Sequence, residues 1–488
     1  MKLDITVGKY TLESLTNGMY ASPLDLYREY IQNAVDSFDE AAAKGIGKEK
    51  DFQIEIMLDS VVQSIFIRDN GCGIEKEKAV KTLLDIGNSK KKRSVSRGFR
   101  GIGRLAGLGY CSKLSFVTSA VGESIKTIIV FDANELKQLL LSVDEESVSV
   151  QDVLEKIVKI KYVPEKASAH YFEVILENVD MAGKLLNKEL VEDYLVQHSP
   201  LPFGMDFRWS SLILSKLEML GCNVKDYKLI LEVDGARKEL FKPYQNTFVA
   251  DRVRKTEDTL KDIVIVPFYR NEKLCAVLWY GQTEFFGTIL DSSIKGIRIR
   301  QGNILIGGRS TCNQFFKEER FNGWAVGELH ILDPELIINS RRDDFEKNAA
   351  YYEFVELVSE WSWNLSKEIR KKSYDRSLSN EKKAVIEADV FDDINGLGTE
   401  AIEFSDEYGE AELMDAGDSQ FLAENDYFDK LSLILNQKKA QTKYSALNIN
   451  SKLTIEQRKV LERVFDIISQ EYDKELAEKF TATISRKF

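Results

Sequence analysis

Three polar side chains follow one another at spacings of four and three residues in the stretch 29–36: Glu29, Asn33 and Asp36. On a helix, these spacings place all three on one face. Apolar residues fall on the opposite side and suit a core: Ile31, Ala34, Val35 and Phe38. Burying a carboxylate beside an amide is costly unless both have partners. A nucleotide carrying a metal ion is one partner that fits this set.

A second motif, Asp69-Asn70-Gly71-Cys72-Gly73-Ile74, follows the apolar run 61–67. The run predicts a strand that delivers Asp69 into a turn with two glycines. Glycine lets the backbone come close to a flat ligand, because it has no side chain in the way. We therefore take Asp69, Gly71, Gly73 and Ile74 as candidate ligand contacts.

A glycine-rich stretch, 98–109, comes directly after the basic and polar segment 90–97. We expect the glycines to lead into a helix whose exposed N–H groups and dipole favour anions. The basic segment has three interpretations: a solvated loop, a mobile lid over phosphates, or a patch that binds nucleic acid. The candidate phosphate-side residues are Asn88, Lys90, Gly98, Arg100, Gly101, Ile102, Gly103 and Arg104.

Together, the helix with E-x-x-x-N-x-x-D, the strand ending in D-x-G-x-G and the glycine-rich lid resemble the GHKL ATPases. This superfamily includes the gyrase B subunit, the ninety-kilodalton heat-shock chaperone, MutL, MORC proteins and sensor histidine kinases. The order of the segments is most similar to the heat-shock chaperone and to MORC-like bacterial ATPases. The resemblance covers about residues 1–345. It implies binding and hydrolysis of ATP with Mg²⁺.

The resemblance also assigns roles to these residues. Asn33 would hold Mg²⁺ through its amide oxygen, and Glu29, one turn earlier, would act as general base on a water. Asp69 would accept a hydrogen bond from the exocyclic amine of adenine, where guanine presents a carbonyl. Asp36 is a further nucleotide contact or, with Asn70, orients loops. The alternative role for Glu29 is a buried ion pair with Arg28 or a lysine.

One strand departs from the family pattern. GHKL proteins often carry a Gly-Thr pair at the start of the strand expected at 171–176, with the threonine near the adenine. This sequence has His170, Tyr171 and Phe172 there. The adenine contacts from this strand therefore stay open, and Thr118 on an earlier strand is a poor substitute.

Further along, the stretch 337–345 resembles the middle-domain catalytic loop of the heat-shock chaperone. Ser340 and Arg341 match that loop, whereas the glutamine expected soon after is absent. The resemblance implies that Arg341 meets the γ-phosphate and stabilises the transition state. The alternative is a salt-bridged helix start in which Arg342 pairs with Asp343 or Glu346.

The 488 residues have room for two or three domains, and we expect an α+β protein. An N-terminal Bergerat-type α/β sandwich would span 1–200 and an S5-like transducer or middle domain 204–345. A long helix would follow at 346–376, then an acidic, partly disordered segment at 377–450 and a C-terminal helix at 451–488. The acidity is local: 381–430 holds sixteen Asp and Glu against three Lys, so the remainder is close to neutral.

Composition excludes several classes of protein. No run of eighteen apolar residues exists, and the N-terminus lacks the apolar block of a signal peptide, so we expect a cytoplasmic protein without membrane contact. Five scattered cysteines and three histidines give little support to a disulfide framework or a zinc site.

The resemblance predicts a chaperone-like clamp: ATP closes a homodimer around a protein client or operon partner, and hydrolysis reopens it. A clamp that acts on DNA, of the MORC, MutL or gyrase kind, is the first alternative. A scaffold that binds ATP as a switch without turnover is the second. A histidine kinase is disfavoured, because no histidine lies in a dimerising phosphoacceptor helix.

Overall fold

The computed structural model describes residues 8–9, 11–12, 22–85, 103–141, 149–339 and 341–395, with side chains described as far as residue 377. The chain divides into two compact units, Met1–Gly396 and Leu397–Phe488. Most of residues 1–21, most of the acidic segment and the predicted C-terminal helix lie outside the described residues. Within the described part, no helix is long and apolar enough to cross a membrane.

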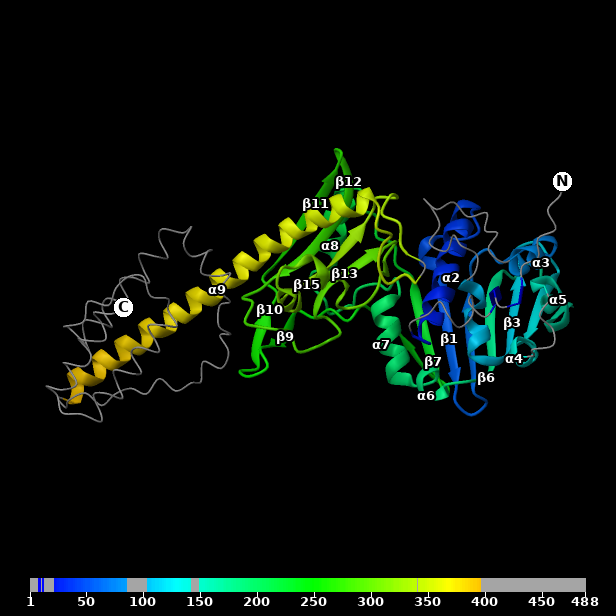
Figure 1. Cartoon of the computed structure of the whole chain (residues 1–488), viewed down its shortest axis with the longest axis horizontal. Helices are drawn as coiled ribbons and strands as arrows, with labels where there is room; N and C mark the ends of the chain where they lie inside the picture. The colour runs from blue at the N-terminus through cyan, green and yellow to red at the C-terminus, as the bar shows by residue number, and fades with distance from the viewer. Residues whose placement is uncertain are drawn as a thin grey trace. The chain divides into compact units, whose positions relative to one another are not determined.

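The first sheet has eight strands in the order β5-β4-β3-β6-β2-β1-β7-β8. Its strands β1, β3, β6 and β7 are labelled in Figure 1. All its neighbours are antiparallel except β1 and β7, which run parallel. The strands are β1 (Gln53–Asp59), β2 (Ser64–Asp69), β3 (Cys111–Ser119), β4 (Ile125–Asp132), β5 (Val158–Pro164), β6 (Tyr171–Val179), β7 (Lys228–Val233) and β8 (Ala236–Glu239).

Helices cover one face of this sheet. In β1 the buried residues alternate with half-buried ones, as expected for a strand with one face in a core. The buried side chains join those of the helices in a single core. The helices are α2 (Asp25–Ala43), α3 (Lys76–Leu84), the 3₁₀ helix η2 (Gly103–Gly109), α4 (Ala133–Leu141), α5 (Val150–Ile157), α6 (Ala182–Leu185) and α7 (Lys188–His198), with η1 (Glu49–Asp51) before β1. This arrangement confirms a two-layer α/β sandwich.

Helix α2 carries the first motif and confirms the predicted periodicity. Leu26, Ile31, Val35 and Phe38 are buried on its core side. Ser22 would suit the N-cap by residue type, but the cap position is Leu24, two residues later. The Ser22 hydroxyl instead accepts a hydrogen bond from the Leu24 N–H in the turn before the helix.

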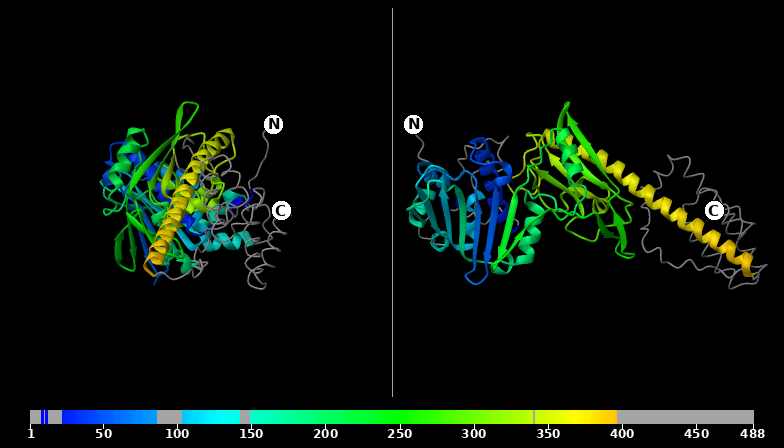
Figure 2. Two further views of the ribbon diagram at one scale, coloured as in Figure 1. Left: turned by 90° about the vertical axis from the view of Figure 1, so that its left-hand side faces the viewer. Right: turned by 180° about the vertical axis from the view of Figure 1, so that it is seen from behind.

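A second, five-stranded sheet has the order β11-β12-β15-β13-β14. Side chains on one of its faces pack with α9, and those on the other pack with α8. Figure 2 shows both sheets in two further views. The elements are α8 (Ser210–Met219), β9 (Thr247–Ala250), β10 (Thr256–Thr259), β11 (Asp262–Arg270), β12 (Lys273–Gln282), β13 (Gly296–Gln301), β14 (Ile304–Leu305), η3 (Thr311–Phe315), η4 (Glu319–Trp324), β15 (Val326–Ile331) and α9 (Ala349–Asn395).

Three elements run past the limits expected from the sequence. Strands β7 and β8 follow the proline-rich boundary near residue 200, yet they complete the first sheet beside β1. Helix α9 extends to Asn395 rather than to 376. Prolines mark where a helix ends, but they do not reveal which strands pair beyond it. The proposed domain limits therefore stay predictions.

Candidate active site

The Glu29 carboxylate is buried on α2, with 4% of the residue exposed. Its partner is Arg342, from the segment that follows the second sheet. The Arg342 Nε atom lies 2.8 Å from one carboxylate oxygen, and a terminal nitrogen lies 3.1 Å from the other. This two-point pairing is the strong form of an arginine–carboxylate contact. Glu29 thus forms a buried ion pair, with an arginine that is distant in sequence.

Gly103, the first residue of η2, lies directly against Glu29. A β-carbon at Gly103 would come within 1.8 Å of a Glu29 carboxylate oxygen. Tyr30, the next residue on α2, ties the two helices together: its hydroxyl donates to the Arg104 carbonyl at 3.1 Å and accepts from the Gly107 N–H at 3.0 Å. The part of the glycine-rich stretch that begins at Gly103 is therefore held against Glu29. A side chain larger than that of glycine at position 103 would collide with the carboxylate.

Asn33 and Asp36 follow Glu29 on α2, and both are half-buried. Amide and carboxylate oxygens on one helical face are donors that suit Mg²⁺, which needs few protein ligands when phosphates supply others. In the described part of the chain, no group of three or more His, Cys, Asp or Glu side chains is placed to hold a metal ion. One amide and one carboxylate on this face would need further oxygen ligands, such as those of a phosphate, to hold Mg²⁺.

Asp69 ends β2 and is buried, with 4% of the residue exposed. One carboxylate oxygen accepts the Gly71 N–H at 2.9 Å. Burial raises the pKa of Asp69 to about 7, against the lowering effects of hydrogen bonds from Gly71 and Ser37. A β-carbon at Gly71 would lie 2.1 Å from the Ser37 hydroxyl of α2. The lack of a side chain at Gly71 thus lets the loop sit against α2.

Thr118 fixes the end of the same loop. Its hydroxyl accepts the Ile74 N–H at 2.8 Å and donates to the Tyr171 carbonyl at 3.1 Å. Gly73 has a φ of +63°, and a β-carbon there would lie 1.9 Å from the Ser119 carbonyl oxygen. Thr118 therefore serves the loop backbone, a role that the sequence did not indicate.

Phe172 lies opposite Asp69 on one neighbouring strand and opposite Thr118 on the other. Residues directly opposite in an antiparallel pair share a face, so these three form a row across the sheet. The Phe172 ring is half-buried and stacks on Phe116, with centroids 5.7 Å apart. His170 holds the loop from the side, since its Nδ1 lies 2.8 Å from the Gly71 carbonyl oxygen. An aromatic ring thus flanks the buried carboxylate.

The structure separates the two adjacent arginines of the predicted catalytic loop. Arg341 is exposed, and its carbonyl oxygen accepts a hydrogen bond at 3.0 Å from Arg28 on α2. Arg342, with a φ of +59°, is the one whose guanidinium reaches Glu29. The sequence signal was the arginine pair itself, which does not reveal which member faces the site.

Several predicted contacts are not placed at the site. Asn88, Lys90, Gly98, Arg100, Gly101 and Ile102, like Ser340 of the catalytic-loop motif, lie outside the described residues. Arg104 is described, and its guanidinium donates to the Asp85 carbonyl at 2.5 Å. Asn70 accepts the Gln53 N–H at 2.8 Å and donates to the Asp51 carbonyl at 2.8 Å, so it orients the loop before β1. For Arg104 and for the predicted contacts outside the described residues, a role toward phosphate stays a prediction.

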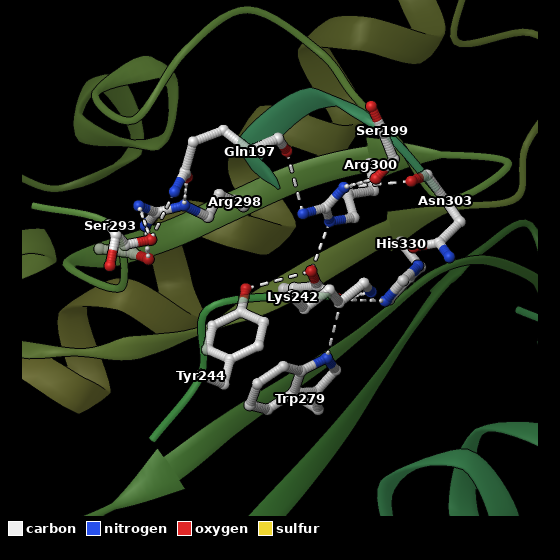
Figure 3. Close-up of polar contacts among 12 residues, drawn as sticks. Gln197, Ser199, Lys242, Tyr244, Trp279, Ser293, Arg298, Arg300, Asn303 and His330 are labelled. Atoms are coloured by element: carbon white, nitrogen blue, oxygen red, sulfur yellow. Dashed lines mark hydrogen bonds and ion pairs between the residues drawn. The ribbon is translucent and has the colours of Figure 1, made fainter. Parts of the chain in front are cut away.

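A second cluster of buried charge surrounds Glu328 on β15. Figure 3 labels its Lys242, Tyr244 and Arg300. This carboxylate pairs with Arg300 and, at 2.7 Å, with Lys242. It also accepts from the Tyr244 hydroxyl at 3.1 Å and from the Trp279 indole at 3.3 Å. Burial alone would raise the pKa of Glu328, but the two cations hold it well below its usual range. Burial lowers the pKa of Lys242 to about 8.

Arginines of the same region form hydrogen bonds with the C-terminal end of α7. The Gln197 carbonyl accepts from Arg300 at 3.1 Å, and its side-chain oxygen accepts from Arg298 at 2.9 Å (Figure 3). Farther back on α7, the Tyr194 hydroxyl donates to Asp25 of α2 at 2.8 Å. Helix α7 therefore connects the helix that carries Glu29 to the second sheet by direct hydrogen bonds. Each of the donors named here already has at least one protein acceptor, so we assign no ligand to this cluster.

Comparison with known proteins agrees with this geometry. The family model of histidine kinase-, DNA gyrase B- and HSP90-like ATPases matches residues 26–158, which hold α2, the Asp69 loop and η2. This match supports the assignment of the N-terminal region to the GHKL ATPase superfamily.

Among curated proteins, the chain is similar to the chaperone protein HtpG of several bacteria. Identity is 26% over 159 residues with the protein of Rickettsia akari (29% of this chain, 25% of the relative). It is 27% over 141 residues with that of Orientia tsutsugamushi (25% and 22%), and 32% over 95 residues with that of Legionella pneumophila strain Lens (18% and 15%). The first of these matches covers about a quarter of the relative's length. Together with the family match, the similarity supports ATP binding by the N-terminal region.

Proposed function

We propose that this protein is a Mg²⁺-dependent ATPase that works as a chaperone-like conformational clamp, with ATP-driven closure of a homodimer around a protein client or operon partner. The observation that carries the proposal is the convergence on Glu29 of three segments: α2, the end of the glycine-rich stretch at Gly103, and Arg342 from beyond the second sheet. The buried Glu29 carboxylate contacts both Gly103, a candidate phosphate contact, and Arg342, which lies far away in sequence. Such a site could link ATP hydrolysis to a movement of the segment that carries Arg342.

Each residue has a chemical task in this proposal. The Asp69 carboxylate accepts the exocyclic amine of adenine, and Gly71 and Gly73 let the loop backbone pass the base. Glu29 takes the proton of a water that attacks the terminal phosphate. A magnesium ion, held by Asn33 and phosphate oxygens, would neutralise phosphate charge when bound. An arginine of the 341–342 pair stabilises charge in the transition state.

Phosphate release by the full chain with Mg-ATP tests turnover, and native mass measurement with a non-hydrolysable ATP analogue tests closure. We expect steady release of phosphate and a higher dimer fraction when the analogue is present. Release without any change in mass would contradict the clamp. Analogue binding with no release would favour the non-hydrolysing scaffold.

A DNA-acting clamp is the second candidate, because the basic segment 90–97 adjoins the glycine-rich stretch. The same release assay with duplex DNA separates the two functions. For a clamp on protein clients, we expect DNA to leave the rate unchanged. A several-fold stimulation that falls steeply with added salt would favour DNA, since salt weakens phosphate-backbone contacts.

Phe172 gives a test of the base subsite. We propose that its half-buried ring packs against the adenine in place of the family's threonine. Stacking of an aromatic ring on a base contributes about 1–3 kcal/mol, so Phe172→Ala should weaken ADP binding by at least about fivefold in calorimetry. Phe172→Tyr keeps the ring and should keep most of the affinity. Equal ADP affinity in the alanine variant and the wild type would refute this contact.

A further inference from the structure

We propose that His170 is a positioning residue for adenine recognition, which it serves through a chain of hydrogen bonds that ends on the Asp69 carboxylate. The chain begins at the His170 ring and passes through the peptide group between Gly71 and Cys72. It then continues through the Ser37 hydroxyl to Asp69. The inference rests on the proposed function, in which Asp69 accepts the exocyclic amine of adenine. It adds the two side chains that hold this acceptor in place.

One peptide group of the Asp69 loop is held on both of its edges. The His170 Nδ1 atom lies 2.8 Å from the Gly71 carbonyl oxygen. Because a carbonyl oxygen can only accept, Nδ1 must carry the hydrogen. The N–H of the same peptide group belongs to Cys72 and donates to the Ser37 hydroxyl at 3.1 Å. A peptide group that follows glycine is otherwise free to turn, so His170 and Ser37 together fix its orientation.

The Ser37 hydroxyl connects this peptide group to Asp69. Because the hydroxyl accepts the Cys72 N–H, it keeps its own hydrogen for a second partner. A β-carbon at Gly71 would lie 2.1 Å from the Ser37 oxygen and 2.8 Å from Oδ1 of Asp69, so both oxygens border the same small space. Burial raises the pKa of Asp69, and the hydrogen bond from Ser37 opposes this rise. The Cys72 sulfur, 3.7 Å from the hydroxyl, is a weaker acceptor than a carboxylate.

The start of β6 holds His170 at its place beside the loop. Tyr171, the next residue, lies opposite Ser119 of β3, and its carbonyl accepts the Thr118 hydroxyl at 3.1 Å. The Tyr171 ring lies against the Arg68 guanidinium, whose carbon is 4.0 Å from the ring centroid. The segment that carries His170 is therefore fixed by contacts of its own, and the half-buried His170 ring is left to hold Gly71.

The donors of this chain all point in one direction, toward Asp69. His170 donates to the carbonyl, the Cys72 N–H donates to the hydroxyl, and the hydroxyl donates to the carboxylate. Successive hydrogen bonds polarise one another, so that each strengthens the next. A hydrogen bond from the adenine amine depends on the distance and angle at its acceptor. Loss of His170 should therefore weaken recognition of the amine, although His170 does not touch Asp69 itself.

The test isolates the contact with the exocyclic amine. Calorimetry on the full chain with Mg²⁺ compares ADP with purine riboside 5′-diphosphate, which differs from ADP only in lacking this amine. The measured quantity is the ratio of the dissociation constant of the analogue to that of ADP. Loss of one hydrogen bond from the chain should lower this ratio by about two- to tenfold, both in His170→Ala and in Ser37→Ala.

Further variants separate positioning from a general effect on structure. In His170→Asn the amide nitrogen lies as many bonds from the backbone as Nδ1, so it can donate to Gly71 and should restore most of the ratio. His170→Gln places this nitrogen one bond farther out and should behave like the alanine variant. Combining His170→Ala with Ser37→Ala should lower the ratio no further than the larger single change, because both act through one chain. Ser60→Ala removes an exposed hydroxyl that donates to Asp234 at 2.8 Å, and should leave the ratio unchanged.

Three outcomes would overturn the inference: equal loss of affinity for both ligands in His170→Ala, an asparagine variant no better than the alanine variant, or single effects that multiply in the double variant. Any of these, with a wild type that prefers ADP, leaves the proposed ATPase intact. Thermal unfolding verifies that each variant is folded. If His170→Ala does not fold, the comparison of His170→Asn with His170→Gln decides the same question. A wild type that binds both ligands equally, or neither, refutes the proposed adenine contact, and the inference falls with it.

Discussion

Replacing Glu29 by alanine is expected to stop ATP hydrolysis while ATP still binds. A positioned general base contributes about 10²–10⁴-fold to rate, so phosphate release in single turnover should fall by at least about a hundredfold. Binding should persist or tighten, because the variant removes a negative charge near the phosphates and frees Arg342. Calorimetry with a non-hydrolysable ATP analogue measures binding separately from turnover.

Glu40 offers a matched control on the same helix. It is exposed and pairs with Lys44 at 2.7 Å on the surface of α2. Glu40→Ala should therefore hydrolyse ATP at the wild-type rate. If the Glu29 variant also hydrolysed normally, the base would have to be sought elsewhere.

The second large effect is expected at Asp69. Asp69→Asn replaces a charged acceptor with an amide and should weaken ATP binding by about 10–100-fold, the range for losing one hydrogen bond to a charged group. The Gly71 N–H can still donate to the amide oxygen, so the loop should keep its shape. Asp59→Asn is the control, because Asp59 accepts the Val61 and Val62 N–H groups at the far end of β1. Weak binding in both variants would point to a general loss of structure instead.

The pKa of Asp69 adds a dependence on pH. Burial raises this pKa to about 7, whereas the same carboxyl group in the unfolded chain has a pKa of about 4. Between about pH 4 and pH 7, the folded protein therefore keeps a proton that the unfolded chain has already lost. This group therefore stabilises the folded protein at acid pH, and the contribution is lost as pH rises through about 7.

The proposed hydrogen bond from the exocyclic amine of adenine is stronger to the charged form of this carboxylate than to the neutral form. Below about pH 7 the ATP affinity should consequently fall by up to about tenfold per unit. Calorimetry in buffers of different ionisation enthalpy would detect the proton released on binding. Asp69→Asn should abolish both the proton release and this part of the pH dependence.

Local patterns in the sequence were enough to predict the elements that carry the motifs. The periodicity around Glu29 predicted a helix, and the apolar run before Asp69 predicted a strand; both are confirmed. The family resemblance selected the candidate residues. The glycines in the motifs also indicated close packing, because a β-carbon at Gly71 or Gly103 would collide with a neighbouring side chain.

Contacts between distant segments could not be predicted in this way. Which of Arg341 and Arg342 faces α2 depends on a backbone φ of +59° at Arg342, a conformation that arginine seldom adopts and that no local pattern indicates. Thr118 was judged a poor substitute for a base contact, and its hydroxyl is in fact engaged by the loop backbone. Both facts depend on packing between segments far apart in the chain.

The parallel pairing of β1 with β7 determines where the chain can be shortened to give a stable N-terminal fragment. A fragment cut near the prolines at 200 and 202 would lack the strand that covers β1 and would leave a row of unsatisfied backbone groups beside Ile54, Ile56 and Leu58. Such bare edges recruit other chains and promote aggregation. A soluble ATP-binding fragment should therefore extend at least through Glu239, where β8 ends.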